Sequence, residues 1–571
     1  MKKIFYSIFI ISSLIYSQKI SAQSANNQKW WKEAVVYQIY PRSFKDSDGD
    51  GVGDLKGIIS KLDYIKSLGI DVVWINPVYS SPNDDNGYDI SDYRNIMKEF
   101  GTMEDFDNLL KGLHQRGIKL VMDVVVNHSS DEHEWFKQAR SSRLSPYRNY
   151  YHWWDADRGK PNYRYSLFDV NHDAWKYDST TNAYYLHFFS RKQPDLNWEN
   201  PRLRKEIYDM MKFWAEKGVD GYRLDAFQFA AKDTTFPKFS DGFEKNFSKY
   251  YAVQNGLHDY LKEMNKEVFS KYDVMTVAEG AGNSFQDAHD MVDAERNELN
   301  MAYAFDGVDI AKPEGYSLLH FKEVFTKWDS VFAEKGWLSI FLANHDQARL
   351  VTRFGNDSNE YRDVSSKMLT TFLLTMRGTP YYYNGDELGM TNIRFNKIED
   401  YRDMSTINEY KYQQSIGADM KKYLEEIKFK SRDNGRTPFQ WDASINAGFS
   451  EGKSTWLAVN PNYTIINAAA EERDKNSCLN YFRKAIQLRK NNKVFVYGKY
   501  TLIDKSNDKV YAYTRELNGK KILIALNFTK ENASFKTNYD VSKAKILLDN
   551  YSNASKNKIL KPYEAVVYEL K

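Results

Sequence analysis

Eight short apolar runs alternate with segments of helical pattern over most of this chain of 571 residues. Parallel strands that are buried on both faces read as near-continuous apolar runs, and a helix between two such strands lets them run in the same direction. Eight units of this kind predict a closed (β/α)8 barrel, a TIM barrel. The eight runs cover residues 35–44, 71–78, 119–128, 221–227, 273–280, 301–307, 338–346 and 379–387.

The segments between the runs supply the predicted helices. Apolar residues recur at helical spacing over 58–68 and 102–117, and a long helical region is expected over 241–271. Each of these segments connects two consecutive runs, as the barrel requires.

Two segments break this alternation. Residues 129–200, between the third and fourth runs, are aromatic and rich in Asp, Asn and Arg, and we interpret them as an inserted B subdomain on the C-terminal face of the barrel. Residues 494–571 alternate like half-buried strands and carry turn pairs at Asn507-Asp508 and Asn518-Gly519, which predicts a separate antiparallel β-domain. The barrel then occupies residues 29–128 and 201–493.

The N-terminus has the pattern of a secretory signal. Lys2 and Lys3 precede an apolar run from Ile4 to Tyr16, and small residues end at Ala22. The run is too short to span a membrane, so we expect residues 1–22 to be removed and the protein to be periplasmic or secreted, without a membrane anchor.

Charge and cysteine content narrow the choice of partners. Loss of residues 1–22 removes three lysines and no acid, so the formal charge of +3 falls to about zero. This balance does not favour nucleic acid as a partner. Cys478 is the single cysteine of the chain and makes no internal disulfide. We expect a monomer.

An acidic loop follows the first run. Asp46, Asp48, Asp50 and Asp54 alternate with small residues, and this pattern matches the first part of a calcium loop. The twelfth position is Gly57 rather than the bidentate Glu of an EF-hand. A metal site and a solvated acidic turn are both consistent with the pattern.

Polar residues stand at the C-terminal ends of several predicted strands, where TIM-barrel enzymes carry their chemistry. A closed barrel brings such ends around one axis, so their carboxylates are expected to face a common site. The ends in question are Asp123 with Asn127 and His128; Arg223 with Asp225; Glu279; and Asn344 with His345 and Asp346.

Two carboxylates at one site are the requirement for glycoside cleavage. Arg223 beside Asp225 is expected to keep that carboxylate ionised, and the apolar and small neighbours of Glu279 favour its protonated form. Structural ion pairs at the strand ends are one alternative. A metal site is another, although the acids and histidines lack a compact metal-ligand spacing.

Five ordered motifs resemble glycoside hydrolase family 13, the α-amylase family, over nearly all of residues 29–571. Three further stretches resemble its oligo-1,6-glucosidase and α-glucosidase subfamily. The five motifs are DVVVNH (123–128), QPDLNW (193–198), GYRLDAF (221–227), TVAEG (276–280) and FLANHD (341–346). The three stretches are SPNDDNGYDISDY (81–93), IEDYRD (398–403) and RDNGRTPFQW (432–441).

This resemblance implies a role for each matched residue. Asp225 would be the nucleophile, Glu279 the general acid and base, and Asp346 the stabiliser of the transition state. Contacts with the sugar are implied for His128, Arg223 and His345. Asp85, Tyr88 and Arg432 would close the pocket around a terminal glucose. Phe188 would form an aromatic wall of the pocket. The calcium ligands would be Asp46, Asp48, Asp50, Asp54 and the carbonyl of Val52, with Mg²⁺ as the alternative ion and no organic cofactor.

The implied activity is that of a retaining exo-α-glucosidase acting on short oligosaccharides with α-1,6 or α-1,4 bonds. Ala226 stands where members that prefer α-1,6 bonds carry Val and those that prefer α-1,4 bonds carry Thr, and residues 166–175 replace a shorter, glycine-rich segment. Both departures leave the linkage and the leaving group open.

Two other functions remain as alternatives. One is a trehalose- or sucrose-type glucosyltransferase or isomerase on the same fold. The arginine-rich Arg-Leu-Asp-Arg loop of sucrose isomerases is not visible in 301–325, which favours hydrolysis. The other is a non-catalytic sugar-binding homologue, and the presence of both Asp225 and Glu279 argues against it.

Overall fold

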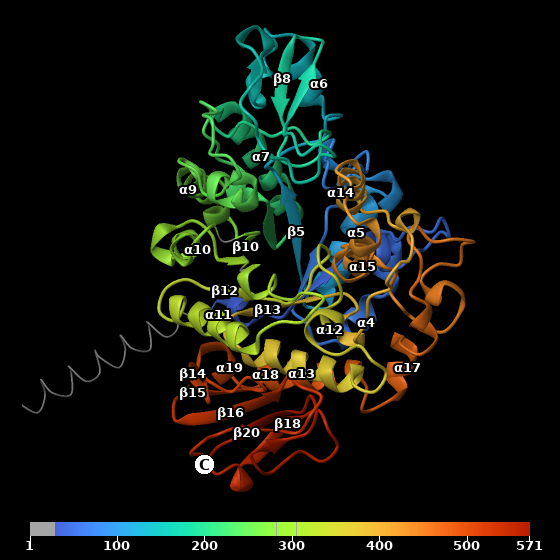
Figure 1. Ribbon diagram of the computed structural model, residues 1–571, viewed down its shortest axis with the longest axis vertical. Coiled ribbons are helices and arrows are strands. Elements are labelled where there is room, and N and C mark those ends of the chain that lie inside the picture. The colour runs from blue at the N-terminus through green and yellow to red at the C-terminus, as the bar shows by residue number, and fades with distance from the viewer. Residues whose placement is uncertain (1–28, 281, 304) are drawn as a thin grey trace, which may run out of the picture.

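Eight parallel strands close into a barrel in the computed structural model, which describes residues 29–571 except 281 and 304 (Figure 1). Each strand lies within one of the eight apolar runs, so the predicted barrel is confirmed. The predicted signal segment, residues 1–22, lies outside the described residues. The strands are β1 (Val36–Ile39), β2 (Val72–Ile75), β5 (Lys119–Val125), β9 (Gly221–Asp225), β10 (Met275–Ala278), β11 (Met301–Tyr303), β12 (Leu338–Ile340) and β13 (Thr379–Tyr383).

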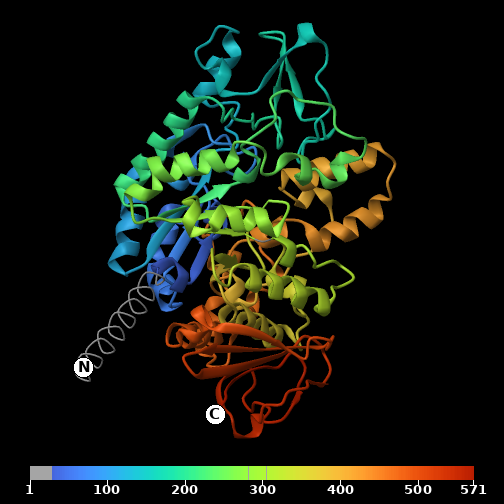
Figure 2. The same cartoon turned by 90° about the vertical axis from the view of Figure 1, so that its left-hand side faces the viewer.

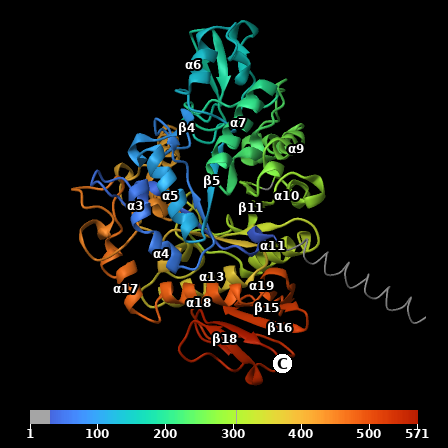
Figure 3. The same cartoon turned by 180° about the vertical axis from the view of Figure 1, so that it is seen from behind.

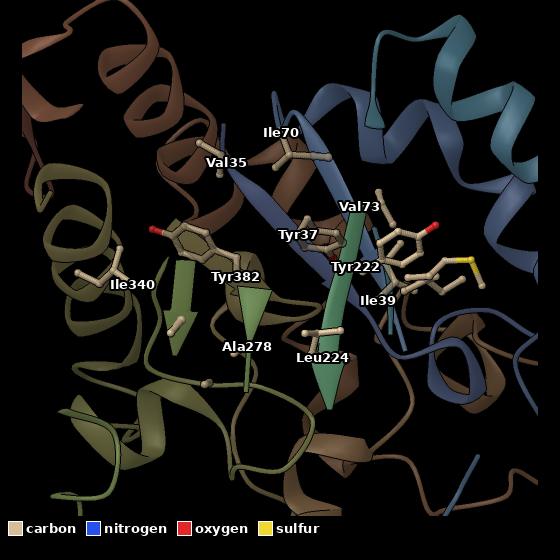
Figure 4. Packing of buried hydrophobic residues seen from close by; sticks show 14 of the residues in the cluster. Val35, Tyr37, Ile39, Ile70, Val73, Tyr222, Leu224, Ala278, Ile340 and Tyr382 are labelled. Atoms are coloured by element: carbon tan, nitrogen blue, oxygen red, sulfur yellow. The ribbon is translucent and has the colours of Figure 1, made fainter. Parts of the chain in front are cut away.

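Alternate residues of the barrel strands belong to two different apolar clusters. Val36 of β1 packs inside the barrel with residues such as Trp74, whereas Tyr37 and Ile39 face outward into the layer of helices. Figure 4 shows this outer layer, with Tyr37 and Leu224 among the side chains that pack between strands and helices. Because strand side chains point alternately to opposite faces, a strand can supply both layers only if nearly all of its residues are apolar.

The helices surround the barrel. Helix α5 (Met103–Gln115) begins at a capping box between Thr102 and Asp105 and buries Phe106 and Leu110 on one face. Figure 3 shows α5 and α10 on opposite sides of the barrel. The other principal helices are α3 (Leu55–Ser60), α4 (Leu62–Ser67), α7 (Pro201–Lys217), α9 (Leu257–Glu267), α10 (Phe285–Val292), α11 (Leu318–Val331), α13 (Arg362–Thr375) and α18 (Cys478–Lys490).

The long helical region expected over 241–271 is wrong as one element. The structure has the short helix α8 (Ser248–Tyr251) and then α9, separated by a connection in which Val253 and Gly256 adopt positive φ angles of 52° and 96°. A left-handed backbone ends an α-helix, and the glycine adopts it without steric cost.

The inserted segment between the third and fourth barrel strands forms its own antiparallel sheet at one end of the molecule (Figures 1 and 2). The order of its strands is β6-β8-β7. They are β6 (Trp153–Asp155), β7 (Trp175–Asp178) and β8 (Ala183–Leu186), and helix α6 (Glu134–Ser141) precedes them.

The C-terminal region forms a five-stranded antiparallel sheet at the opposite end of the molecule, as predicted (Figure 2). The pair Asn518-Gly519 forms the two-residue turn between β15 and β16, with φ angles of 50° and 79°. The strands are, in sheet order, β14 (Lys499–Ile503), β15 (Val510–Leu517), β16 (Lys520–Asn527), β20 (Ala565–Glu569) and β18 (Lys545–Asp549). Within the described part of the chain, no helix combines the length and the apolar character that crossing a membrane requires.

Candidate active site

A cavity of about 930 Å³ opens at the carboxyl ends of the barrel strands. Asp225 is the last residue of β9, Glu279 directly follows β10, and Asp346 lies in the loop after β12. All three carboxylates line the cavity, together with four other residues that the sequence selects: Asp85, Tyr88, His128 and Arg432.

Arg223 holds three carboxylates together beneath the cavity. Its side chain is fully buried, and Nη1 lies 2.8 Å from Oδ1 of Asp123 and also contacts Asp225. Nη2 contacts Oε1 of Glu279. Oε2 of Glu279 accepts a hydrogen bond of 2.9 Å from the backbone N–H of Ala226. One guanidinium therefore places the two candidate catalytic carboxyl groups beside each other.

The pKa values of these carboxyl groups differ from the sequence-based expectation. Burial raises the pKa of Glu279 to about 7, as expected, and the attraction of Arg223 opposes that shift. Burial also raises the pKa of Asp225 to about 7 and that of Asp123 to about 6, again against the attraction of Arg223. The expectation that Arg223 keeps Asp225 ionised is not met in full, because burial outweighs the attraction of Arg223 and Asp123 adds repulsion. Near neutral pH the cluster therefore keeps a proton available.

Asp346 has the opposite environment. Oδ1 lies 3.0 Å from Nη1 of Arg432 and 2.7 Å from Nη2 of Arg436, and Oδ2 lies 3.1 Å from Nε2 of His345. Burial disfavours the charge of this carboxylate, but the histidine and the two arginines outweigh burial and hold its pKa well below the usual range. Asp346 is thus a fixed negative charge that faces the cavity.

A hydrogen-bonded chain orients His345. The side-chain amide of Gln38 donates to Oδ1 of Asn76 at 2.8 Å and lies 2.7 Å from Nδ1 of His345. Nδ1 therefore accepts, and the ring proton stands on Nε2, which faces Asp346. The ring also stacks on Tyr88, with 5.2 Å between centroids. Sequence reasoning missed Gln38, since a single amide inside an apolar strand carries no motif.

A second ionic cluster lies around Arg432 at the cavity. Nη2 of Arg432 lies 3.3 Å from Oδ1 of Asp85 and also pairs with Asp403. Burial raises the pKa of Asp85 to about 6, and Arg432 opposes this shift. The amide of Gln193 donates to Oδ2 of Asp85 at 3.2 Å. These groups form a polar wall of carboxylates, guanidinium and amide on one side of the catalytic carboxylates.

His128 belongs to the same wall and is neutral. Its ring is buried, and burial lowers its pKa to about 3. Nε2 donates to the backbone carbonyl of Tyr88 at 3.1 Å. A neutral imidazole in this place can hydrogen-bond a sugar hydroxyl without adding charge.

The assignment of Phe188 to the cavity wall is corrected by the structure. Its ring stacks on Tyr251 at 4.1 Å with an angle of 4° between the ring planes, in an apolar cluster beside the cavity. The neighbouring Phe189 lines the cavity and packs on Phe168, with 5.4 Å between their centroids. Phe188 and Phe189 stand in a bend after β8, where no strand alternation in the sequence shows which of the two rings faces the cavity.

The other side of the cavity was not predicted. It is built from loops after β9, β10 and β11 and from the start of α11, which carry no motif that marks them as a site. Its aromatic residues are Phe229, Phe247, Phe285, Phe305 and Trp328, and its charged residues are Asp306, Asp309, His320, Glu323 and Lys327.

The predicted metal loop brings part of its ligand set together. Carboxylate oxygens of Asp46, Asp48 and Asp50 lie within 4.8 Å of one another. Burial, and then the neighbouring Asp48 and Asp46, raise the pKa of Asp50, so a hard cation held by these oxygens would relieve their repulsion. Asp54 lies outside this group of three and caps α3 by accepting from the N–H of Gly57 at 2.7 Å. The N–H of Val52 donates to Asp50 at 2.7 Å.

Comparison with known proteins agrees with this geometry. A family model described as the catalytic domain of alpha amylase matches residues 38–498. An oligo-1,6-glucosidase from Parageobacillus thermoglucosidasius is 50% identical over 560 residues, covering 95% of this chain and 99% of that protein.

Two solved structures are similar over the same extent. The trehalulose synthase MutB from Pseudomonas mesoacidophila MX-45 is 44% identical, with a TM-score of 0.92 and coverage of 95% of this chain and 100% of that one. An isomaltulose synthase from Klebsiella sp. LX3 is 43% identical, with the same TM-score and the same coverage. The fold, the carboxylates at the strand ends and these matches together lead to one conclusion: this chain is a glycoside hydrolase and belongs to the α-amylase family.

Proposed function

We propose that the protein is an exported, retaining exo-α-glucosidase that hydrolyses terminal α-1,6 or α-1,4 bonds of short, neutral oligosaccharides. The observation that carries this proposal is the pair Asp225 and Glu279, held by one guanidinium in a cavity that Asp85, Asp346 and Arg432 also line. The likeness to an oligo-1,6-glucosidase supports the same substrate class.

The pair Asp225 and Glu279 suits a retaining mechanism. Both carboxyl groups contact terminal nitrogens of Arg223, which favours the separation of about 5 Å of retaining enzymes over the larger gap of inverting ones. Asp225 attacks the anomeric carbon while Glu279 protonates the glycosidic oxygen, and the leaving sugar departs. Glu279 then takes a proton from water, the water oxygen attacks the anomeric carbon, and the bond to Asp225 breaks.

Action at the chain end follows from the cluster around Arg432. The contacts of Arg432 with Asp85, Asp346 and Asp403 fill the space beyond the sugar that would occupy the site next to Asp225. Such a wall offers charged hydrogen-bond partners to the hydroxyls of one terminal glucose and leaves no passage for a longer chain.

The opposite side of the cavity favours a neutral leaving group. Its three acids, Asp306, Asp309 and Glu323, outnumber the single lysine, Lys327. An acidic lining disfavours phosphorylated sugars through charge repulsion. Aromatic residues on the same side offer stacking surfaces to an uncharged sugar ring.

A glucosyltransferase or sucrose isomerase is the second candidate. The similarity to a trehalulose synthase and an isomaltulose synthase favours it, and a covalent glycosyl intermediate can be intercepted by a sugar hydroxyl in place of water. Hydrolysis is preferred because residues 301–325 lack the arginine-rich loop of sucrose isomerases.

Three accessory properties complete the proposal. The loop of Asp46, Asp48 and Asp50 would hold a structural Ca²⁺, or Mg²⁺ in its place, because all of its donors are oxygen atoms. The signal pattern in residues 1–22 would direct export to the periplasm or the medium. The protein would act as a monomer.

Product analysis tests the proposal. Purified protein is incubated separately with isomaltose, maltose and sucrose, and the products are separated by chromatography, with Asp225→Asn as the control. Release of glucose from isomaltose or maltose by the wild type alone is the expected result. Conversion of sucrose to an isomer, with little free glucose from any substrate, would contradict it and favour the second candidate.

A further inference from the structure

Residues 166–175, which depart from the pattern of the family, lie between the inserted sheet and helix α14 (Met404–Ser415). Figure 1 shows α14 next to the inserted part of the chain. Phe168 and Leu167 of this segment line the catalytic cavity. The position of the segment therefore decides where one wall of the sugar site stands.

Three contacts join this segment to one face of α14. Nε2 of His172 lies 3.2 Å from Oε2 of Glu409, and the ring of His172 packs edge-on against Tyr412, with 4.3 Å between centroids. The side chain of Asn408 donates to the backbone carbonyl of Phe168 at 2.9 Å. Tyr412 lies one helical turn after both Asn408 and Glu409, so the three residues lie on one side of the helix.

The backbone of His172 has an uncommon conformation at this contact. Its φ angle is 54°, in the left-handed region that residues other than glycine rarely adopt. Its carbonyl accepts from Ser166 and from the hydroxyl of Tyr163, so hydrogen bonds on its own side hold the turn. A residue kept in a sparsely populated conformation marks a candidate functional position.

The contact reaches the catalytic site through Phe168. The guanidinium carbon of Arg432 lies 4.8 Å from the centre of the Phe168 ring. Arg432 in turn contacts Asp85 and Asp346 in the sugar site. A shift of residues 166–175 away from α14 would therefore move both an aromatic wall and the arginine that it covers.

We propose that His172 is a positioning residue: its ion pair with Glu409 clamps residues 166–175 onto α14 and fixes Phe168 and Arg432 for binding of the terminal sugar. This inference rests on the proposed hydrolysis of isomaltose or maltose.

The clamp has a defined pH dependence. The groups that face His172 are Glu409 and Tyr412 from α14 and Tyr165 and Asp169 from its own segment. Glu409 raises the pKa of His172 above its ordinary value, and His172 lowers that of Glu409, so the carboxylate stays ionised while the imidazole titrates. The clamp is strongest below the raised pKa of His172 and weakens as pH rises through it.

The test compares His172→Asn, Glu409→Gln, the double variant and the control Lys160→Gln. Asparagine tolerates the left-handed backbone but is too short to reach Glu409. Lys160 lies 3.3 Å from the carboxylate of Asp173 in the same segment, so its variant controls for general loss of charge. Steady-state kinetics use the better of isomaltose and maltose at several pH values.

The clamp predicts a rise in KM of about threefold to tenfold for each single variant, with kcat changed less than about twofold. The double variant should be no worse than the poorer single variant, and Lys160→Gln should match the wild type. The KM of the wild type should rise as pH increases through the raised pKa of His172, whereas that of His172→Asn should not. If His172→Asn does not fold, Glu409→Gln and the pH profile of the wild type decide.

Unchanged KM in the variants, additive losses in the double variant, or a pH-independent KM of the wild type would overturn the clamp. If the wild type hydrolyses neither disaccharide, the proposed function is contradicted but the clamp is not. Calorimetric titration with glucose then tests the clamp. A glucose Kd that is about threefold weaker in His172→Asn supports it, and an equal Kd or no binding overturns it.

Discussion

At the scale of single residues, Asp225 and Glu279 share one guanidinium, and the proton that one of them carries determines the chemistry. Glycoside cleavage needs Glu279 protonated in its first step, and burial raises its pKa to about 7. The rate of hydrolysis should therefore fall as pH rises above about 7, because the acid loses its proton. A profile of kcat against pH measures this limb, because the contact of His172 with Glu409 is expected to change KM rather than kcat.

Glu279→Gln provides the matched comparison for that profile. The amide carries no titrating proton, so the residual activity of the variant should lack the basic limb. A basic limb that persists unchanged in Glu279→Gln would assign the titration to another group and contradict the role of Glu279.

Ala226 determines the space next to the nucleophile. Its φ angle is 46°, and its side chain lines the cavity between Asp225 and the unpredicted acceptor side. Ala226→Val should narrow this side and raise the ratio of activity on isomaltose to activity on maltose about tenfold, as added methyl groups do in tight pockets. It should also cost about 1–3 kcal/mol of stability, because a β-branched residue fits a left-handed backbone poorly. The rates of hydrolysis of both disaccharides measure the first effect, and thermal melts measure the second. An unchanged ratio of activities would show that Ala226 does not set the linkage preference.

Individual side chains were predictable from the sequence where a motif fixed them and not elsewhere. The motifs correctly bring Asp225, Glu279 and Asp346 to one cavity. They do not show which of Phe188 and Phe189 faces it, since both stand in a bend that has no regular alternation of sides. The raised pKa of Asp225 was also missed, because it depends first on burial and then on repulsion from Asp123, and both arise only after folding.

At the scale of elements, the loop before α3 is the clearest test of a ligand site. If Asp46, Asp48 and Asp50 hold a divalent cation in the folded protein only, Ca²⁺ should raise the melting temperature by about 2–5 °C over EDTA-treated protein. Asp50→Asn should reduce this response, since it removes one of three charged donors. Thermal melts with and without Ca²⁺ provide the measurement, and equal melting temperatures for the wild type in both conditions would contradict a Ca²⁺ site.

The strands were the most predictable elements, and the reason is burial. Six of the eight barrel strands contribute to a cluster inside the barrel and to another beneath the helices, so their sequences are apolar nearly throughout, whereas β9 and β12 contribute only to the outer cluster. The helices were less predictable. The composition of residues 241–271 suggests one continuous helix, but positive φ angles at Val253 and Gly256 interrupt it. The N–H of Val253 donates a hydrogen bond to the carbonyl of Gln228, a tertiary contact that no local sequence pattern reveals.

At the scale of the whole molecule, the barrel and the C-terminal sheet share one apolar core. Tyr511 of β15 packs on Phe321 of α11 and Phe372 of α13. Arg515 is fully buried and donates to the carbonyls of Thr375 and Gly498. A sheet that buries these groups against the barrel is not an independent unit, so thermal unfolding should be one cooperative transition.

Differential scanning calorimetry measures that cooperativity. A chain that ends at Tyr497 should be insoluble, because it exposes the apolar faces of α11 and α13 that the sheet covers. Two resolved transitions, with a soluble and active truncated chain, would show that the barrel folds without the sheet.

The central claim is double displacement at Asp225 on an α-glucoside, and the configuration of the first product tests it most directly. Proton NMR of the glucose released from isomaltose or maltose in the first minutes, before mutarotation, distinguishes the two anomers. The retaining mechanism predicts α-glucose as the first product, with at least about a 10⁴-fold lower rate for Asp225→Asn. Initial release of β-glucose, or release by Asp225→Asn at the rate of the wild type, would contradict it.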